Sequence, residues 1–176
     1  GGAGAVGHYA VQFARRLGAA QVLATTSTPA KAELARAAGA DTVVDYRSAD
    51  AAAQLLSATK GQGVDRIIEV DIAANAALDL EVLRPGGTCV VYGSGQGRFE
   101  LPFFPLISRN VSMLFFIVYA LSEADRRRAE ATLTRLLVHG GLQHQIGERF
   151  VLADLVRAHE AVEQGRVLGN VVVALP

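Results

Sequence analysis

The sequence lacks several features that mark specialised classes of protein. It has one cysteine, so no intramolecular disulfide framework can form. Lys plus Arg and Asp plus Glu both number 17, so the basic excess typical of nucleic-acid-binding proteins is absent. The longest apolar run, residues 111–121, is shorter than the roughly 20 residues that span a bilayer. These absences argue against a nucleic-acid or membrane partner and favour a cytoplasmic location.

Residues suited to binding a metal are also scarce. The four histidines have no metal-like spacing with one another or with Cys89, so the sequence predicts no metal site. Cys89 lies in an apolar segment, and we expect a buried core thiol rather than a nucleophile. No grouping of serine, histidine and aspartate is evident, and the sequence assigns no catalytic residue.

The chain begins with glycines in a recognisable pattern. Gly2, Gly4 and Gly7 spell G-x-G-x-x-G and run into a segment with helical periodicity. Such a turn brings backbone N–H groups and the positive end of a helix dipole close to a pyrophosphate. An ordinary glycine-rich loop is the alternative. Because the motif normally follows a strand and nothing precedes Gly1, we interpret the sequence as a fragment cut at the end of the first strand of a nucleotide-binding unit.

Strand-like and helix-like segments then alternate with short connections. This alternation predicts an α/β fold with a Rossmann-type doubly wound parallel sheet, its first strand apparently truncated. The expected strands are residues 21–26, 42–45, 65–70 and 88–93. An apolar strand follows at 111–119, then a long helix at 122–139. The tail reads as a strand, a helix and a strand at 146–151, 153–163 and 170–175.

The segment after the strand at 21–26 bears on the choice of nucleotide. NAD-binding folds place an acidic residue there for the adenosine ribose, about 20 residues past the glycines. This chain has hydroxyls at Thr26 and Ser27 and no acid before Glu33. Lys31 lies one helical turn further on, and Tyr46 follows the next strand. A missing carboxylate and a nearby lysine favour NADP(H); the alternative is that Lys31 is merely an exposed helix residue.

Other candidate residues follow later strands, at the carboxyl edge where open α/β sheets bind ligands. Gly93 would let the nicotinamide half of a cofactor approach the backbone, with Ser94 beside it. Asp71 is either a catalytic acid or, as we expect, a cap on the helix that follows it. The arginines at 126–128 are predicted to form a solvated helix face.

Five segments resemble one family in a single unbroken register. The sequence is similar to the C-terminal half of the zeta-crystallin-like quinone oxidoreductases, in the medium-chain dehydrogenase/reductase superfamily. The segments that carry the resemblance are residues 1–7, 39–46, 64–70, 83–88 and 158–165.

The resemblance implies hydride transfer from NADPH to a quinone or activated alkene (enone), without zinc. It also implies that Lys31 and Tyr46 hold the adenosine 2′-phosphate, and that segments 116–118 and 168–170 face the nicotinamide end. The family often has a lysine where Asn170 stands, which puts that position in doubt. Together, the residue arguments and the resemblance assign to the cofactor Gly4, Ala5, Val6, Gly7, Thr26, Ser27, Lys31, Tyr46, Gly93, Ser94, Phe116, Val118, Leu168 and Asn170.

The same resemblance implies a domain organisation and an assembly. Residues 1–144 would form the dinucleotide-binding domain, and residues 145–176 would pack on an N-terminal substrate domain that this sequence lacks. The apolar strand 111–118 would pair with its twin in a homodimer, unless it is covered within the chain. We expect the fragment alone to be inactive.

Other functions stay open. One is a different enzyme of the superfamily, either an enoyl reductase or a zinc-type alcohol dehydrogenase. The presence or absence of metal ligands in an upstream domain would distinguish these enzymes. Another is a non-catalytic nucleotide-binding or dimerisation module.

Overall fold

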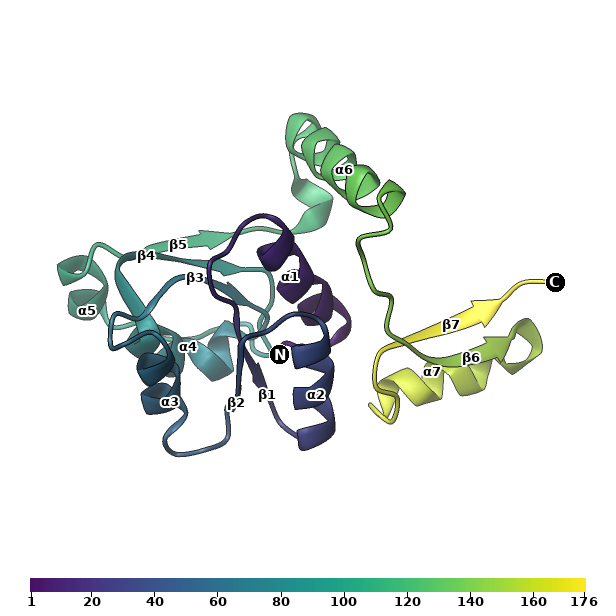
Figure 1. Cartoon of the computed structure of the whole chain (residues 1–176), viewed down its shortest axis with the longest axis horizontal. Helices are drawn as coiled ribbons and strands as arrows, with labels where there is room; N and C mark the ends of the chain where they lie inside the picture. Colours follow the sequence, from purple (N-terminus) through teal and green to yellow (C-terminus); the bar gives the residue numbers. More distant parts are fainter. The chain divides into compact units, whose positions relative to one another are not determined.

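The computed structural model describes residues 1–176 as two compact units. Unit 1 combines Gly1–Tyr46 with Gly140–Pro176, and unit 2 is Arg47–His139. The strands form three separate hydrogen-bonded groups in which every pairing is parallel. The predicted α/β fold, with parallel strands alternating with helices, is confirmed (Figure 1).

The amino-terminal part of unit 1 is two helices and a two-stranded parallel sheet. The elements are α1 (Ala5–Arg16), β1 (Leu23–Thr26), α2 (Pro29–Ala37) and β2 (Thr42–Asp45). Thr28 is the last residue of the loop between β1 and α2, and it caps α2. Its Oγ1 accepts a hydrogen bond from the Lys31 N–H at 3.2 Å. The core between these elements consists mostly of alanine and valine, so the helices pack closely on the strands. Its buried members are Val11, Val22, Ala24, Ala35, Ala38 and Ala40.

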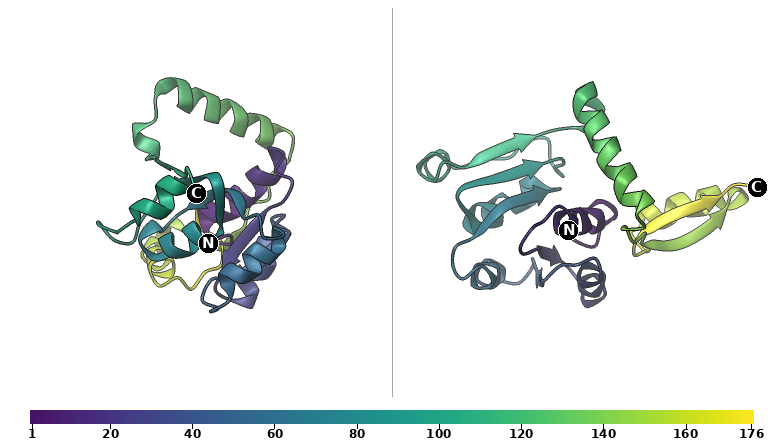
Figure 2. Two further views of the ribbon diagram at one scale, coloured as in Figure 1. Left: turned by 90° about the vertical axis from the view of Figure 1, so that its left-hand side faces the viewer. Right: turned by 45° about the horizontal axis from the view of Figure 1, so that its top comes forward.

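The carboxyl-terminal part of unit 1 is a second parallel pair with one helix along it (Figure 2). It consists of β6 (Ile146–Val151), the short 3₁₀ helix η2 (Leu152–Asp154), α7 (Leu155–Glu163) and β7 (Asn170–Ala174). Phe150, Ala158 and Ala161 form its small buried core.

A buried glutamine joins the two parts of unit 1. The Gln12 side chain, on α1, donates to the Gln143 carbonyl at 3.0 Å and accepts from the Gln143 N–H at 2.7 Å. The Tyr9 hydroxyl and His144 Nδ1 lie 2.7 Å apart beside this pair. These bonds fasten the segment leading into β6 to the helix that follows the glycine turn.

Unit 2 has a three-stranded parallel sheet in the order β3-β4-β5. Helix α4 packs against β3 and β4, over a core that includes Ile72, Leu83, Cys89 and Val91. On α6, Arg127 and Arg128 pair with Glu123 and Asp125, as a solvated charged face does. The elements of unit 2 are α3 (Ala51–Ala58), β3 (Val64–Glu69), α4 (Ile72–Val82), β4 (Leu83–Val91), α5 (Phe103–Ser108), β5 (Ser112–Phe115), the 3₁₀ helix η1 (Val118–Ala120) and α6 (Glu123–Val138).

One expectation for the strands of unit 2 needs correction. The apolar segment predicted as a strand over 111–119 is a strand only at Ser112–Phe115, because β4 ends at Val91 and leaves nothing further to pair with. The last bond of this ladder runs from the Phe116 N–H to the Val91 carbonyl, at 3.1 Å. The proline-containing segment before β5 includes the short helix α5. No helix in the chain is both long and apolar enough to cross a membrane.

Candidate nucleotide-binding site

The glycine turn of unit 1 presents unpaired donors at the start of α1. Gly4 is the N-cap, with extended backbone angles and no side-chain cap. The first N–H of the helix to find a partner is that of His8, which donates to the Gly4 carbonyl at 2.9 Å. The N–H groups of Ala5, Val6 and Gly7 precede it and bond to nothing in the chain. Three free donors at the positive end of a helix suit an anion.

Steric fit explains which glycines the turn requires. A Cβ on Gly7 would lie 2.0 Å from the Gly1 carbonyl oxygen, and a Cβ on Gly2 would lie 2.6 Å from the Ala24 Cβ. Neither position accepts a side chain without moving backbone or core. A Cβ on Gly4 would meet only the Gly1 oxygen, at 3.5 Å. Gly4 therefore borders open space.

The residues predicted for the adenosine end lie at the carboxyl ends of β1 and β2. Thr26 is buried, and its carbonyl accepts a hydrogen bond from the Tyr46 N–H at 3.2 Å. Ser27 follows it, and the Lys31 side chain, on the first turn of α2, has no hydrogen-bond or ion-pair partner. The unit thus brings Thr26, Ser27, Lys31 and Tyr46 to one edge.

Acidic groups near this edge are of two kinds. Glu33, the first acid after β1, pairs with Arg36 at 2.5 Å along α2. Asp45 ends β2 directly opposite Thr26 in the ladder. Sequence reasoning missed Asp45 because only the strand register places it beside Thr26.

Unit 2 has a cavity of about 560 Å³ at the carboxyl ends of β4 and β5. Two ring contacts shape its wall: Tyr92 with Phe116, centroids 6.4 Å apart, and Phe99 with Phe115, 6.3 Å apart. Three predicted residues, Gly93, Ser94 and Phe116, line it, while Val118 does not. The complete lining is Ile72, Val91, Tyr92, Gly93, Ser94, Phe99, Phe115, Phe116, Ile117, Ala120 and Leu121.

Asp71 does not cap α4 as the sequence suggested. Its side chain makes no cap hydrogen bond; instead, Oδ1 accepts the Gly95 N–H at 2.7 Å. The buried Glu69 carboxylate lies at the start of α4. It accepts one hydrogen bond from the Asp71 N–H and another from Asn75 Nδ2, the latter at 2.9 Å. The expectation failed because the Asp71 carboxylate accepts the Gly95 N–H instead, while the Ala74 and Asn75 N–H groups at the helix start donate to the Asp71 carbonyl.

A group of buried ionisable side chains lies behind the cavity. Burial, and then the negative charge of Glu69, raise the pKa of Asp79 to about 8. Burial also raises the pKa of Cys89 to about 12, with Asp79 and Glu69 adding to the effect. The same two causes, burial and Glu69, raise the pKa of Tyr92. Cys89 is therefore a buried neutral thiol, as predicted, and the environment of Asp79 favours its protonated form.

The turn before β7 uses its polar groups internally. The Asn170 N–H and Nδ2 both donate to the Gln145 carbonyl, at 2.7 and 3.2 Å. Gly169 has a φ of 106°, and a Cβ there would lie 2.6 Å from the same oxygen. The Asn170 side chain thus fastens the turn, while Leu168 beside it is partly exposed.

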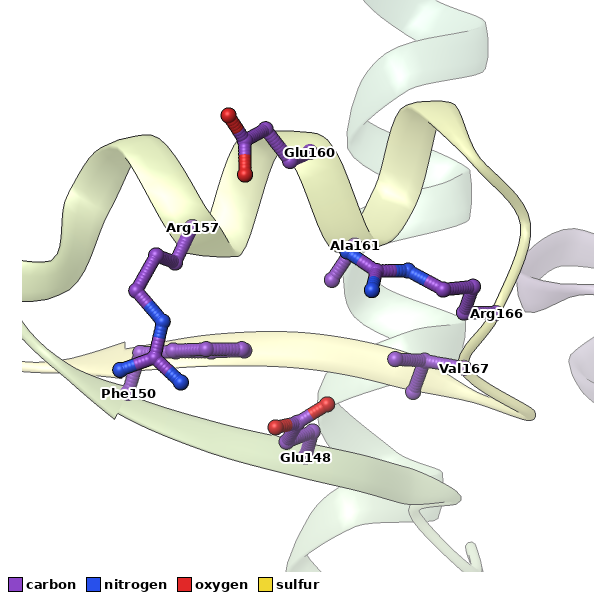
Figure 3. A pocket seen from close by; sticks show the side chains of 7 residues that line it. All are labelled: Glu148, Phe150, Arg157, Glu160, Ala161, Arg166 and Val167. Atoms are coloured by element: carbon purple, nitrogen blue, oxygen red, sulfur yellow. The ribbon is translucent and has the colours of Figure 1, made fainter.

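A second cavity, of about 360 Å³, lies between α7 and β6 in unit 1. Figure 3 shows Arg157 of α7 pointing toward the strands and Arg166 of the following loop extending beneath the helix near Ala161, with Glu148 on β6 below them. Arg157 also pairs with Asp154 at 3.3 Å. None of the predicted site residues lines this cavity, and no cluster of three metal-binding side chains exists in the chain.

Comparison with known proteins agrees with this geometry. Residues 5–137 match the model of the zinc-binding dehydrogenase family, more than half of the chain. The chain belongs to that family. It corresponds to the nucleotide-binding half of medium-chain dehydrogenase/reductases.

Curated relatives of the family are similar over almost the whole chain. A quinone oxidoreductase of Pseudomonas aeruginosa is 30% identical, with 97% of this chain and 54% of the relative covered. A 2-haloacrylate reductase of a Burkholderia species is 29% identical, with 97% and 53% covered. The chain thus spans about half the length of these relatives.

Solved structures show the same fold. The structure of AibC matches with a TM-score of 0.86 at 33% identity, covering 100% of this chain and 48% of AibC. Mycobacterial Rv1454c, solved in complex with NADPH, matches with a TM-score of 0.82 at 29% identity, covering 98% and 54%.

Proposed function

We propose that this chain is the NADPH-binding part of a zinc-independent oxidoreductase that transfers hydride to a quinone or an activated alkene. The observation that supports this proposal most strongly is the composition of one edge of unit 1. Thr26, Ser27 and the unpartnered Lys31 lie together there, and the loop after β1 contains no acidic residue. A 2′-phosphate needs donors and a cation at that position, and an acid in the loop after β1 would repel it. The carboxylate at this edge, that of Asp45, lies outside this loop, at the end of β2 opposite Thr26.

The glycine turn fits the remaining phosphates. The N–H groups of Ala5, Val6 and Gly7 would hold the pyrophosphate, and the open side of Gly4 leaves room for it. Tyr46 offers an exposed ring beside Thr26 for the adenosine. The relative solved with NADPH supports the same cofactor.

We assign the nicotinamide end to Gly93, Ser94 and Phe116 in unit 2, with Val118, Leu168 and Asn170 as further candidates from the family resemblance. When bound, NADPH supplies a hydride from its nicotinamide ring. The apolar and aromatic lining of the cavity favours a flat, electron-poor acceptor. The names of two relatives agree with this type of acceptor: one is a quinone oxidoreductase and the other a 2-haloacrylate reductase.

The test is NADPH oxidation with 1,4-benzoquinone and 9,10-phenanthrenequinone, using this chain and a version extended upstream. We expect turnover only in the extended protein, because residues 145–176 are proposed to pack on a substrate domain. Absence of turnover in both would remove the quinone reductase assignment.

Two similarities to known proteins support an alternative function, the reduction of an activated alkene. A highly reducing polyketide synthase of Emericella nidulans is 31% identical over 99% of this chain, which covers 7% of that synthase. The haloacrylate reductase also acts, by its name, on a conjugated acid. Turnover of 2-enoyl thioesters but not of quinones by the extended protein would favour an enoyl reductase.

We further propose a homodimer through β5. One edge of β5 pairs with β4, the other has no strand beside it, and Leu114 and Phe115 are more than half exposed. An open apolar edge of this kind pairs readily with a second copy.

A further inference from the structure

We propose that Asp71 is a positioning residue whose carboxylate holds the loop after β4 in the place that the cofactor's nicotinamide end requires. The inference rests on the proposed function, which assigns Gly93 and Ser94 of this loop to the nicotinamide. It concerns a residue that contacts the loop and is not itself placed against the cofactor.

The contact is a charge-assisted hydrogen bond across 24 residues of sequence. Asp71 Oδ1 accepts the Gly95 N–H at 2.7 Å. A Cβ on Gly95 would lie 2.9 Å from Oδ2 and 3.3 Å from Oδ1, so the backbone there packs directly on the carboxylate. The bond and this close packing hold Gly95 against the start of α4.

The rest of the loop offers little else to hold it. Ser94 Oγ bonds only within the loop, donating to the Gln96 carbonyl at 2.8 Å and accepting from the Gln96 N–H at 3.3 Å. The Gly93 carbonyl accepts a long bond, 3.4 Å, from the Ile72 N–H. Asp71 is the one side chain from outside residues 93–98 that hydrogen-bonds to them.

The backbone of Asp71 is itself held by hydrogen bonds. Its N–H donates to the buried Glu69 carboxylate, and its carbonyl accepts from the N–H groups of Ala74 and Asn75, both at 3.1 Å. A Cβ on Gly93 would lie 2.3 Å from the Val70 carbonyl, so the ends of β3 and β4 are also in close contact. A continuous series of hydrogen bonds therefore connects the buried Glu69 carboxylate, through Asp71, to the Gly95 N–H.

The experiment compares Asp71→Ala, Asp71→Asn and a matched control, Glu81→Gln. Glu81 is an exposed carboxylate on the same helix, without a partner. The ligands are NADPH and 2′,5′-ADP, which has the adenosine end but no nicotinamide. Calorimetry gives both affinities, and hydrogen exchange reports the amides of residues 93–97.

We expect Asp71→Ala to weaken NADPH binding about tenfold and leave 2′,5′-ADP binding unchanged, because one charge-assisted bond to the loop is lost. Asp71→Asn should recover part of the affinity, since its amide oxygen still accepts the Gly95 N–H. Exchange at residues 93–97 should rise in the alanine variant, and Glu81→Gln should behave as the wild type.

Unchanged NADPH affinity in Asp71→Ala, or an equal loss for both ligands, would overturn the positioning role. If the wild type binds neither ligand, the proposed function fails, and hydrogen exchange decides the inference alone. Unchanged protection of residues 93–97 in Asp71→Ala would then contradict it.

Discussion

The candidate ligand surfaces of the two units are built from different chemistry. In unit 1, the glycine turn and the ends of β1 and β2 present backbone N–H groups, hydroxyls and one lysine. In unit 2, the cavity presents aromatic rings, with buried carboxyl groups behind it. The first surface suits a phosphate and the second a flat apolar group.

The contrast also predicts different responses to substitution. Backbone donors cannot be removed by changing a side chain, so the unit 1 surface fails only when the turn is deformed. The unit 2 surface depends on side chains, and its stability responds to pH through its buried acids.

The largest effect is expected at the glycine turn. Gly7→Ala should abolish measurable NADPH binding, because the new Cβ would lie 2.0 Å from a backbone oxygen and force the turn open. It should also lower the free energy of unfolding by a few kcal/mol, about the cost of severe steric strain. Calorimetric titration and urea unfolding measure the two effects.

Gly4→Ala is the matched comparison. Its Cβ has ordinary contact distance, 3.5 Å, so the fold should keep its stability while NADPH binding weakens about tenfold through crowding of the phosphate. Normal binding by Gly7→Ala would show that the turn is not the phosphate site.

The next effect concerns the buried acids of unit 2. The pKa of Asp79 rises from 3.8 to about 8 on folding, through burial and the neighbouring Glu69. The folded state therefore binds the extra proton, and the stabilisation present below pH 3.8 is lost as pH rises through 8. The slope is at most about 1.4 kcal/mol per pH unit.

Asp79→Asn removes this titration, so its unfolding free energy should vary less between pH 5 and pH 8 than that of the wild type. The elevated pKa values of Cys89 and Tyr92 keep those groups neutral in this window. Urea unfolding at several pH values measures the slopes, and equal slopes in the two proteins would show that Asp79 ionises normally in the fold.

A smaller effect tests whether the apolar edge of unit 2 is an interface. Leu114→Lys should weaken self-association about tenfold or more, because a charge would replace an exposed apolar side chain on β5. Val138→Lys, at an exposed apolar position on α6, is the control and should leave association unchanged. Analytical ultracentrifugation measures both, and a monomeric wild type would remove the dimer proposal.

Local signals predicted most of the fold. The glycine pattern marks the start of a helix, and the structure places the start of α1 there. The end of β5 was mispredicted because it depends on where β4 ends, not on the apolar run itself. Strand length in a parallel sheet is thus a property of the partner strand.

The sequence also predicted where part of the candidate site lies in the fold. Lys31 and Thr26 follow from position along the chain, because the loop after a strand always lies at the carboxyl edge of its sheet. The bond from Asp71 to Gly95 and the position of Asp45 opposite Thr26 required the register of neighbouring strands. Such contacts join residues far apart in sequence, and no local pattern reports them.

The central claim is that unit 1 binds the 2′-phosphate of NADPH, and titration of NADPH and NADH against the wild type and Lys31→Ala tests it most directly. We predict that the wild type prefers NADPH about tenfold or more, and that Lys31→Ala loses most of this preference while its affinity for NADH is unchanged. Equal affinities for the two cofactors in the wild type, unaltered by Lys31→Ala, would contradict the account.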